Sequence, residues 1–222
     1  MEKLVSEMAQ NGTECAKTKK IQEFLSSKVI TTDHFKKAQI VCGVDVSYVD
    51  QCAFAAAITL DVKSLQIIEH SISTTRVTTP YMPGLLMLRE SRAALSAIDG
   101  LREDFDLLMV DANGRLHPRK FGLACFLGVA LDKPTIGIAK GLLCGQVEGV
   151  CVKLEGEKLA HIIEKRKGKR IFVSIGNKIS LKTATSLAES MIKDHEWLPE
   201  PLRLADRFSR QAASTNQNSN KK

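Results

Sequence analysis

Hydrophobic and polar residues in the first third of the chain alternate as they do in β-strands. Strand-like runs cover residues 39–49, 52–60 and 65–77. Connections of only two and four residues separate them, which favours hairpin pairing of consecutive strands. This pattern predicts a three-stranded antiparallel meander.

Later segments alternate between short apolar strands and helical spacing. The runs at 105–110, 135–139 and 171–175 are nearly continuous in apolar residues, which is typical of strands buried on both faces. Helical patterns lie at 21–28, 85–98, 122–130, 181–193 and 199–210. A meander followed by this alternation predicts an α/β fold with one mixed sheet and helices on both faces.

The length of 222 residues suits one compact domain. We expect the catalytic domain over residues 38–212. Residues 1–37 are charged and mixed, and are predicted to form a helical extension of the same domain. Residues 213–222 read as a disordered polar tail.

Composition narrows the class of protein. Apolar residues make up 44% of the chain, enough for a core, but no run approaches the roughly 18 apolar residues of a membrane helix. The first thirty residues lack the apolar centre of a signal peptide. The six cysteines show no C-x-x-C spacing, so reduced core thiols are expected rather than disulfides or zinc. These features predict a soluble cytoplasmic protein.

The positive charge is concentrated near the C-terminus. The net charge is +7, and residues 162–222 carry the whole surplus, with 13 basic against 6 acidic residues. Its densest run lies within residues 165–170. Such a surplus suits a polyanionic partner, because phosphate contacts release counterions. A solvated basic turn explains the charge equally well.

Three acidic residues stand where carboxylates are uncommon. Asp45 interrupts an apolar strand, Asp111 follows another, and Glu90 lies within the predicted helix 85–98. Each alone has a plain structural explanation. In a meander, however, the returning parallel strand commonly pairs beside the first strand, which would make Asp45 and Asp111 face each other. Carboxylates without His or Cys partners suit Mg²⁺, and two such ions can promote phosphodiester cleavage.

A dense polar segment follows the strand 105–110. It contains His117 and Arg119, with Gly114 before them and Gly122 after them. Lys140 ends the strand 135–139, where a lysine can offset charge on a phosphate. A solvated strand-end lysine is the alternative.

Five segments, in order, resemble the motifs of the endonuclease V (deoxyinosine 3′ endonuclease) family. They are VDVSY at 44–48, PYMPGLLMLRE at 80–90, VDANGRLHPR at 110–119, PTIGIAK at 134–140 and LPEPLRLAD at 198–206. The resemblance implies a ribonuclease-H-like fold and a need for Mg²⁺, for which Mn²⁺ can substitute. It also implies nicking at the second phosphodiester bond 3′ to deoxyinosine (hypoxanthine), leaving a 3′-hydroxyl and a 5′-phosphate.

The resemblance also implies residue roles around the cut. Asp45 and Asp111 would be the principal metal ligands, Glu90 would assist them, and Asp206 would lie near the metals. Lys140 would sit by the scissile phosphate or the attacking water.

Further roles concern the nucleic acid. His117 would act near the cut and hold the phosphate backbone together with Arg119. The segment from Pro80 to Pro83 resembles a wedge that is stiffened by its two prolines. The resemblance assigns nucleic-acid contacts to Pro80, Tyr81, Met82, Pro83, Gly84, Leu86 and Gly122. Tyr81 would stack where the lesion is extruded, and Gly84 and Leu86 would meet the edge of the flipped base.

Two positions depart from the family pattern. Ala112 replaces a usual glycine, which adds a methyl group where the backbone could approach the base. Asn177 replaces a frequent histidine and receives no role.

Alternatives remain open at this stage. The chain could be an inosine-specific endoribonuclease, a structure-specific nuclease of the same fold, or a non-catalytic nucleic-acid-binding module. A phosphate-binding domain is disfavoured because no glycine-rich phosphate loop is present. We expect a monomer that binds nucleic acid and no membrane.

Overall fold

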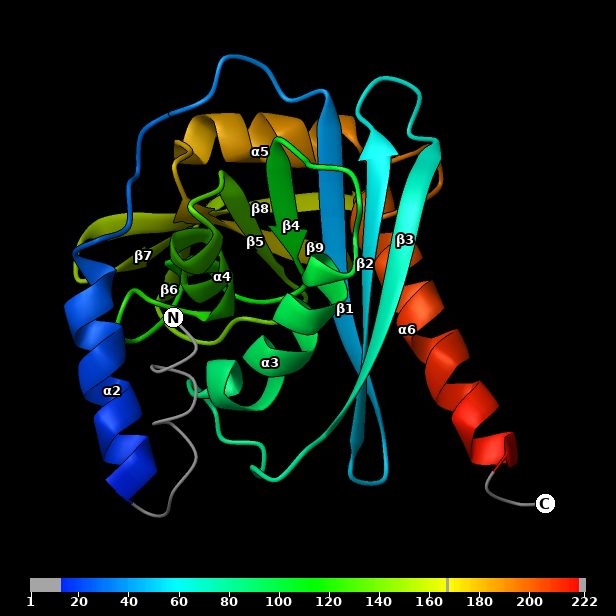
Figure 1. The fold of residues 1–222 in the computed structure, drawn as a ribbon. Coiled ribbons are helices and arrows are strands. Elements are labelled where there is room, and N and C mark those ends of the chain that lie inside the picture. The colour runs from blue at the N-terminus through cyan, green and yellow to red at the C-terminus, as the bar shows by residue number, and fades with distance from the viewer. Residues whose placement is uncertain (1–12, 167, 220–222) are drawn as a thin grey trace.

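The computed structural model describes residues 13–166 and 168–219. Its described residues form one mixed sheet in the order β3-β2-β1-β4-β5-β9-β8-β7-β6 (Figure 1). The strands are β1 Ile40–Val49, β2 Cys52–Asp61, β3 Ile67–Arg76, β4 Leu107–Val110, β5 Thr135–Ala139, β6 Gln146–Glu148, β7 Cys151–Leu154, β8 Glu157–Arg166 and β9 Lys169–Asn177.

Strands β1, β2 and β3 pair antiparallel, whereas β4 and β5 continue the sheet parallel to β1. The predicted meander and the predicted return of a parallel strand beside β1 are therefore both confirmed. This is the mixed α/β architecture of a ribonuclease-H-like fold.

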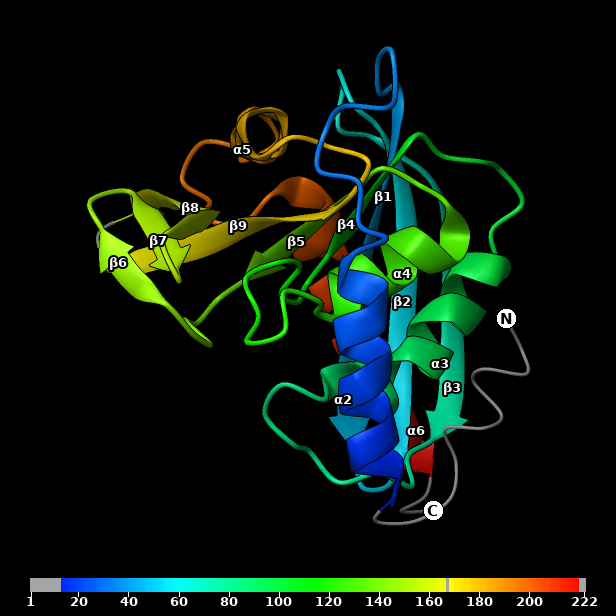
Figure 2. The ribbon, with the colours of Figure 1, turned by 90° about the vertical axis from the view of Figure 1, so that its left-hand side faces the viewer.

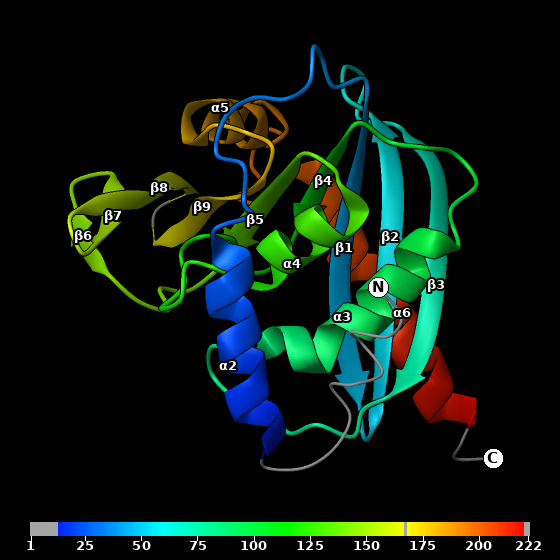
Figure 3. The ribbon, with the colours of Figure 1, turned by 60° about the vertical axis from the view of Figure 1, so that its left-hand side comes forward.

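Helices cover both faces of the sheet, as predicted (Figures 2 and 3). One core packs α3 and α4 against β1, β2 and β4, and a second packs α5 and α6 against the opposite face. The helices are α2 Thr13–Ser26, α3 Leu86–Asp99, α4 Leu123–Leu131, α5 Leu181–Ser190 and α6 Glu200–Ser219. No helix in the described part of the chain has both the length and the hydropathy to span a membrane.

The alternation of β1 residues determines how closely α6 approaches the sheet. Val44 belongs to the core under α3 and α4, so the neighbouring positions Gly43 and Asp45 point to the α6 face. A Cβ at Gly43 would overlap the backbone of Pro201 in α6. The absence of a side chain at Gly43 therefore lets the first turns of α6 lie directly over β1.

The helix near the N-terminus begins earlier than its sequence pattern indicates. It was predicted over 21–28, but α2 spans Thr13–Ser26. Two of its buried side chains, Thr18 and Gln22, are polar. The packed face of α2 therefore cannot be recognised from the spacing of apolar residues.

Strands β6, β7 and β8 were not predicted. β6 is fully exposed and β7 buries only Val152 deeply, so neither shows an apolar pattern. Of the predicted basic run, Lys165 and Arg166 end β8, and Lys169 and Arg170 begin β9.

The predicted polar tail is wrong over residues 213–219. Helix α6 continues to Ser219, and Ala213 is buried. Side-chain hydroxyls of Ser214 and Thr215 donate to the carbonyls of Arg210 and Gln211 one turn earlier, which accommodates polar residues in the helix. Residues 220–222 of the predicted tail lie outside the described residues.

Candidate metal centre

Asp45 and Asp111 face one another at the end of β4. The parallel register pairs Val44 with Val110, and the Asp111 amide donates to the Val44 carbonyl oxygen at 3.1 Å. Because β4 ends at Val110 while β1 continues to Val49, Asp45 lies beside the open end of the shorter strand. The predicted juxtaposition is confirmed.

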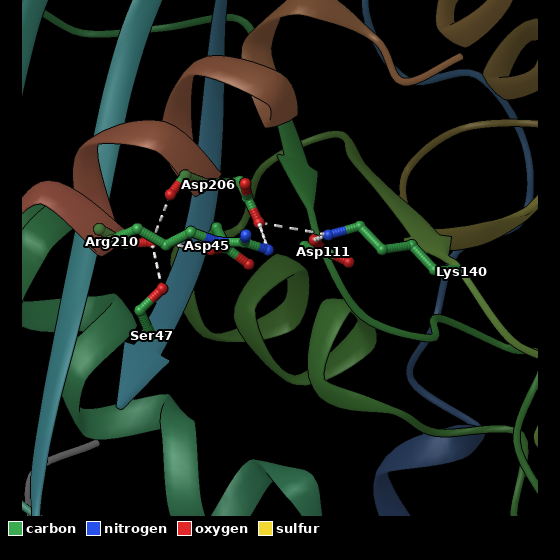
Figure 4. Close-up of polar contacts among 7 residues, drawn as sticks. Asp45, Ser47, Asp111, Lys140, Asp206 and Arg210 are labelled. Atoms are coloured by element: carbon green, nitrogen blue, oxygen red, sulfur yellow. Dashed lines mark hydrogen bonds and ion pairs between the residues drawn. The ribbon is translucent and has the colours of Figure 1, made fainter. Parts of the chain in front are cut away.

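Helix α6 brings a third carboxylate to this point. One carboxylate oxygen from each of Asp45, Asp111 and Asp206 lies within 4.8 Å of the others (Figure 4). Asp206 is one and a half turns into α6, and the close approach of that helix to Gly43 carries it over β1. Three side chains from distant parts of the sequence thus form one acidic cluster.

Burial and mutual repulsion perturb this cluster. Burial, followed by the charge of Asp111, raises the pKa of Asp45 to about 7. The Ser209 hydroxyl donates to Asp45 Oδ2 at 2.9 Å and opposes the rise. Ser47 Oγ lies 2.7 Å from Ser209 Oγ and supports that hydroxyl.

Ser47 and Ser209 were not predicted from the sequence, although their spacing from the acidic residues places them on the same faces. Ser47 is two residues after Asp45, hence on the same face of β1, and Ser209 is three residues after Asp206 on α6.

Two cations partly compensate the acidic cluster. Lys140, at the end of β5, places Nζ 2.5 Å from Asp111 Oδ2 and 3.5 Å from Asp206 Oδ1. Arg210 Nη2 lies 2.9 Å from Asp206 Oδ1 (Figure 4). Lys140 was predicted near the cut, whereas Arg210 was not predicted.

The donor set fits a divalent metal ion. It consists of carboxylate oxygens alone, which hard cations such as Mg²⁺ prefer, and it lacks the His and Cys ligands that zinc favours. Burial and the charge of Asp111 raise the pKa of Asp45, and a bound cation would offset both effects.

Glu90 lies on α3 and is not part of the three-carboxylate cluster. Its Oε1 accepts a hydrogen bond from the Tyr48 hydroxyl at 2.7 Å. Burial raises the pKa of Glu90 to about 8, the Tyr48 hydrogen bond opposes the rise, and the charges of Asp45 and Asp111 add to it. Glu90 is therefore electrostatically coupled to the cluster from one side.

The wedge-like segment is exposed at its tip. The Tyr81 side chain is 62% exposed, and Pro80 and Pro83 are exposed beside it. Met82 is half-buried, with its Sδ 3.5 Å from Cys15 Sγ of α2. Gly84 has a φ of +75°, a conformation that favours glycine.

The carbonyl oxygen of Gly84 is the anchor of this loop. It accepts hydrogen bonds from His117 Nε2 at 3.0 Å, Arg119 Nη2 at 2.7 Å and Gln22 Nε2 at 3.2 Å. His117 is only 2% exposed, so its ring is not placed to bind a phosphate. The predicted phosphate contact of His117 is therefore wrong. The imidazole instead holds the loop through its hydrogen bond to the Gly84 carbonyl. Sequence reasoning also missed Gln22.

A small cavity of about 60 Å³ lies behind the wedge-like loop. Asn113 lines it, and its Oδ1 is buried without a hydrogen-bond partner in the described part of the chain. Buried polar atoms are normally satisfied, so this oxygen is open to a donor from outside. The lining also includes Tyr81, Gly84, Leu86, Gly122 and Leu143, together with the loop-holding residues Gln22 and His117. Predicted nucleic-acid contacts from two segments thus border one cavity.

The two residues that depart from the family pattern, Ala112 and Asn177, are both buried. Asn177 Nδ2 donates to the Gly128 carbonyl at 3.0 Å, and its Oδ1 accepts from the Ile30 amide at 3.0 Å. Asn177 therefore ties the chain before β1 to α4. Ala112 is 5% exposed and packs in the core beneath α3 and α4.

Comparison with known proteins gives consistent results. The family model described as Endonuclease V matches residues 23–207. A protein named Endonuclease V from Thermofilum pendens is 46% identical over 173 residues, which cover 75% of each chain.

Solved structures agree with this match. The Bacillus subtilis Endonuclease V structure superposes with a TM-score of 0.85 at 27% identity and 95% coverage of both chains. Endonuclease V of Ciona intestinalis, in complex with a 24mer DNA containing an inosine followed by a ribo-adenosine, gives a TM-score of 0.84 at 26% identity. That match covers 92% of this chain and 99% of the other.

Proposed function

The chain belongs to the endonuclease V family of metal-dependent endonucleases, and we propose that it nicks DNA at the second phosphodiester bond 3′ to deoxyinosine. The observation that carries the proposal is the cluster of Asp45, Asp111 and Asp206 with Lys140 at its edge. The cavity behind Tyr81, which is separate from this cluster, would receive the edge of the altered base.

Asp45, Asp111 and Asp206 would hold Mg²⁺, with Mn²⁺ as a substitute, and Glu90 would assist from α3. When bound, the metal supplies Lewis-acid activation of water and neutralises charge on the leaving oxygen.

The chain's own residues prepare the reaction. The Ser209 hydroxyl orients the Asp45 carboxylate, and Lys140 keeps an ammonium beside Asp111, where it can balance charge on a phosphate oxygen. A water gives up one proton to solvent as its oxygen adds to phosphorus and the bond to the 3′ oxygen breaks, and that 3′ oxygen takes up a proton from solvent. The products are a 3′-hydroxyl and a 5′-phosphate.

The base would be recognised at the cavity behind the wedge-like loop. The edge of a flipped hypoxanthine would enter it while Tyr81 stacks in the space left in the strand. Asn113 Oδ1 would accept the N1–H of hypoxanthine. Adenine has no hydrogen at N1, so it would leave this oxygen unsatisfied. Loop placement depends on His117 and Arg119, which hold Gly84.

A nicking assay tests the proposal directly. One labelled inosine is placed in duplex DNA, single-stranded DNA and RNA, with Mg²⁺ present or chelated, and the cut is mapped to the nucleotide. We expect Mg²⁺-dependent cleavage of inosine-containing DNA at the second bond 3′ to the lesion. Cleavage of RNA alone would instead identify an inosine-specific endoribonuclease.

Two other outcomes would contradict the proposal. Cleavage of branched duplexes regardless of inosine would indicate a structure-specific nuclease. Binding that is indifferent to Mg²⁺ and yields no product would indicate a non-catalytic module.

A further inference from the structure

We propose that the nucleic-acid strand 3′ of the cut is bound by a groove between the β8–β9 hairpin and the segment that follows β5. This inference rests on the proposed function and extends it to the product side of the site. The groove, here called the hairpin groove, has a volume of about 360 Å³. Its lining includes Lys140, Leu142, Lys169, Arg170, Phe172 and Trp197.

The segment that follows β5 borders the hairpin groove, the acidic cluster and the cavity behind Tyr81. Lys140 lines the groove and is also the residue paired with Asp111. Leu143, three residues later, lines the cavity. Residues 140–143 therefore border both spaces. A strand that places its lesion in the cavity and its scissile phosphate by Lys140 is directed into the groove on the other side of the cut.

The charges of the hairpin groove lack protein counter-charges. Lys169 and Arg170 are exposed, and neither forms an ion pair with any residue that the structure describes. Glu164 lies opposite Arg170 in the β8–β9 register, and its Oε1 accepts the Gly168 amide at 3.1 Å. By contrast, Lys165 on the same hairpin pairs with Glu189 at 2.7 Å.

Cross-strand pairing adds a like-charge contact at the tip of the hairpin. Arg166 of β8 lies directly opposite Lys169 of β9. Like charges in this position destabilise a strand pair unless an anion lies nearby. A phosphate backbone would relieve that repulsion, whereas water alone only screens it.

Aromatic and apolar surface accompanies the charge. The Lys169 ammonium lies 5.4 Å from the centroid of the Trp197 ring, and Trp197 is half-buried. Leu142, which also lines the groove, is 43% exposed. A basic groove with an aromatic platform is the usual means of holding a single strand without reading its sequence. The lining therefore favours a nucleic-acid strand over an acidic protein.

The experiment compares inosine-containing strands that differ only in length beyond the cut. One strand extends about ten nucleotides 3′ of the scissile bond, and the other ends one nucleotide beyond it. Affinity is measured with the metal chelated, for the wild type and for the double variant Lys169→Ala, Arg170→Ala. We expect the variant to lose about tenfold or more in affinity for the long strand and almost nothing for the short one.

Salt dependence and fluorescence give independent measurements. Loss of two phosphate contacts should reduce the slope of log affinity against log salt by about 1.4 for a single strand. Trp197 is the chain's single tryptophan, so its fluorescence should change on binding the long strand but not the short one.

The matched control is Lys36→Ala, Lys37→Ala. These exposed lysines precede β1, at the opposite end of that strand from the acidic cluster. The control should retain wild-type affinity for both strands, and thermal unfolding should verify that both variants are folded.

Failure of this inference is distinguishable from failure of the proposed function. If the wild type nicks inosine-containing DNA but long and short strands bind alike, or if the hairpin variant matches the control, the hairpin groove does not bind the strand. If the wild type fails to nick inosine-containing DNA at all, the proposed function fails first.

Discussion

Lys140 and Asp111 form an ion pair of 2.5 Å across the neighbouring ends of β5 and β4. The parallel register pairs Val110 with Gly137, so both residues follow their strands on the same edge of the sheet. Burial lowers the pKa of Lys140, but the charges of Asp111, Asp45 and Asp206 outweigh it and raise that pKa overall. The ammonium therefore stays charged beside the proposed position of the phosphate.

Replacing Lys140 by Ala should reduce the rate of nicking and leave the affinity for substrate nearly unchanged. An electrostatic contact to the reacting phosphate is worth on the order of 10²–10³ in rate. Lys140→Arg keeps the positive charge and should recover part of that rate. Single-turnover rates and Kd values measured separately would check this. Equal rates for the Ala and Arg variants would contradict an electrostatic role.

Asp111→Asn should abolish nicking while the protein still folds and binds inosine-containing DNA. The amide keeps the shape of the carboxylate but removes the charge that would hold Mg²⁺. The control is Asp194→Asn, since Asp194 is exposed and remote in sequence from the cluster. Mg²⁺-dependent nicking at the wild-type rate by purified Asp111→Asn protein would overturn the assignment.

Much of the fold follows from the alternation of residues along the strands. The apolar runs of β1, β2, β4 and β5 are buried on both faces, so their sequences are distinctive. Strands β6 and β7 were missed because they are short and bury at most one residue. Strand β8 was missed because its consecutive buried residues Leu159 and Ala160 interrupt the alternation expected of a strand. The helical end of α6 was missed because Ser and Thr in its last turns resemble a disordered tail in composition.

For the site, strand order was sufficient to bring Asp45 and Asp111 together. Ser209 and Arg210 were not predictable in the same way, because their place depends on how closely α6 packs over Gly43. His117, by contrast, was predicted as a site residue in a role that the structure does not give it. It is a polar residue in a conspicuous motif, and its ring turns inward to hold Gly84.

Tyr81→Ala should weaken the discrimination between inosine-containing and normal strands. The exposed ring has the freedom to stack on a base, and such stacking is worth about 1–3 kcal/mol. Tyr81→Phe keeps the ring and should behave like the wild type. The ratio of kcat/KM for inosine and adenine substrates measures the effect. An unchanged ratio in the Ala variant would remove Tyr81 from recognition.

Asn113→Ala should also lower the inosine-to-adenine ratio, because it removes the unsatisfied acceptor of a residue that lines the cavity. A buried acceptor that is left without a hydrogen bond costs about 1–3 kcal/mol relative to one that is satisfied. Asn113→Asp retains an acceptor, so it should preserve the ratio even though its negative charge weakens binding to both substrates. If Ala and Asp variants lose discrimination equally, Oδ1 does not read the base.

His117 should make the protein sensitive to acid. Burial lowers the pKa of His117 to about 4, from 6.5. Its Nδ1 accepts the Arg119 amide at 3.2 Å, so the proton resides on Nε2, which donates to Gly84. Between these two pKa values the unfolded chain binds a proton that the folded chain does not. The stability from neutral His117 is therefore complete above pH 6.5 and is lost as the pH falls toward 4.

As the pH falls from 6.5 to 4, protonation linked to His117 should lower the free energy of unfolding by at most about 3 kcal/mol. His117→Gln, which can still donate to Gly84, should lose less stability than the wild type between pH 7 and pH 4.5. The control His34→Gln alters an exposed ring and should follow the wild-type curve. Urea unfolding at each pH provides the free energies. Parallel curves for His117→Gln and the wild type would show that the buried ring does not control acid stability.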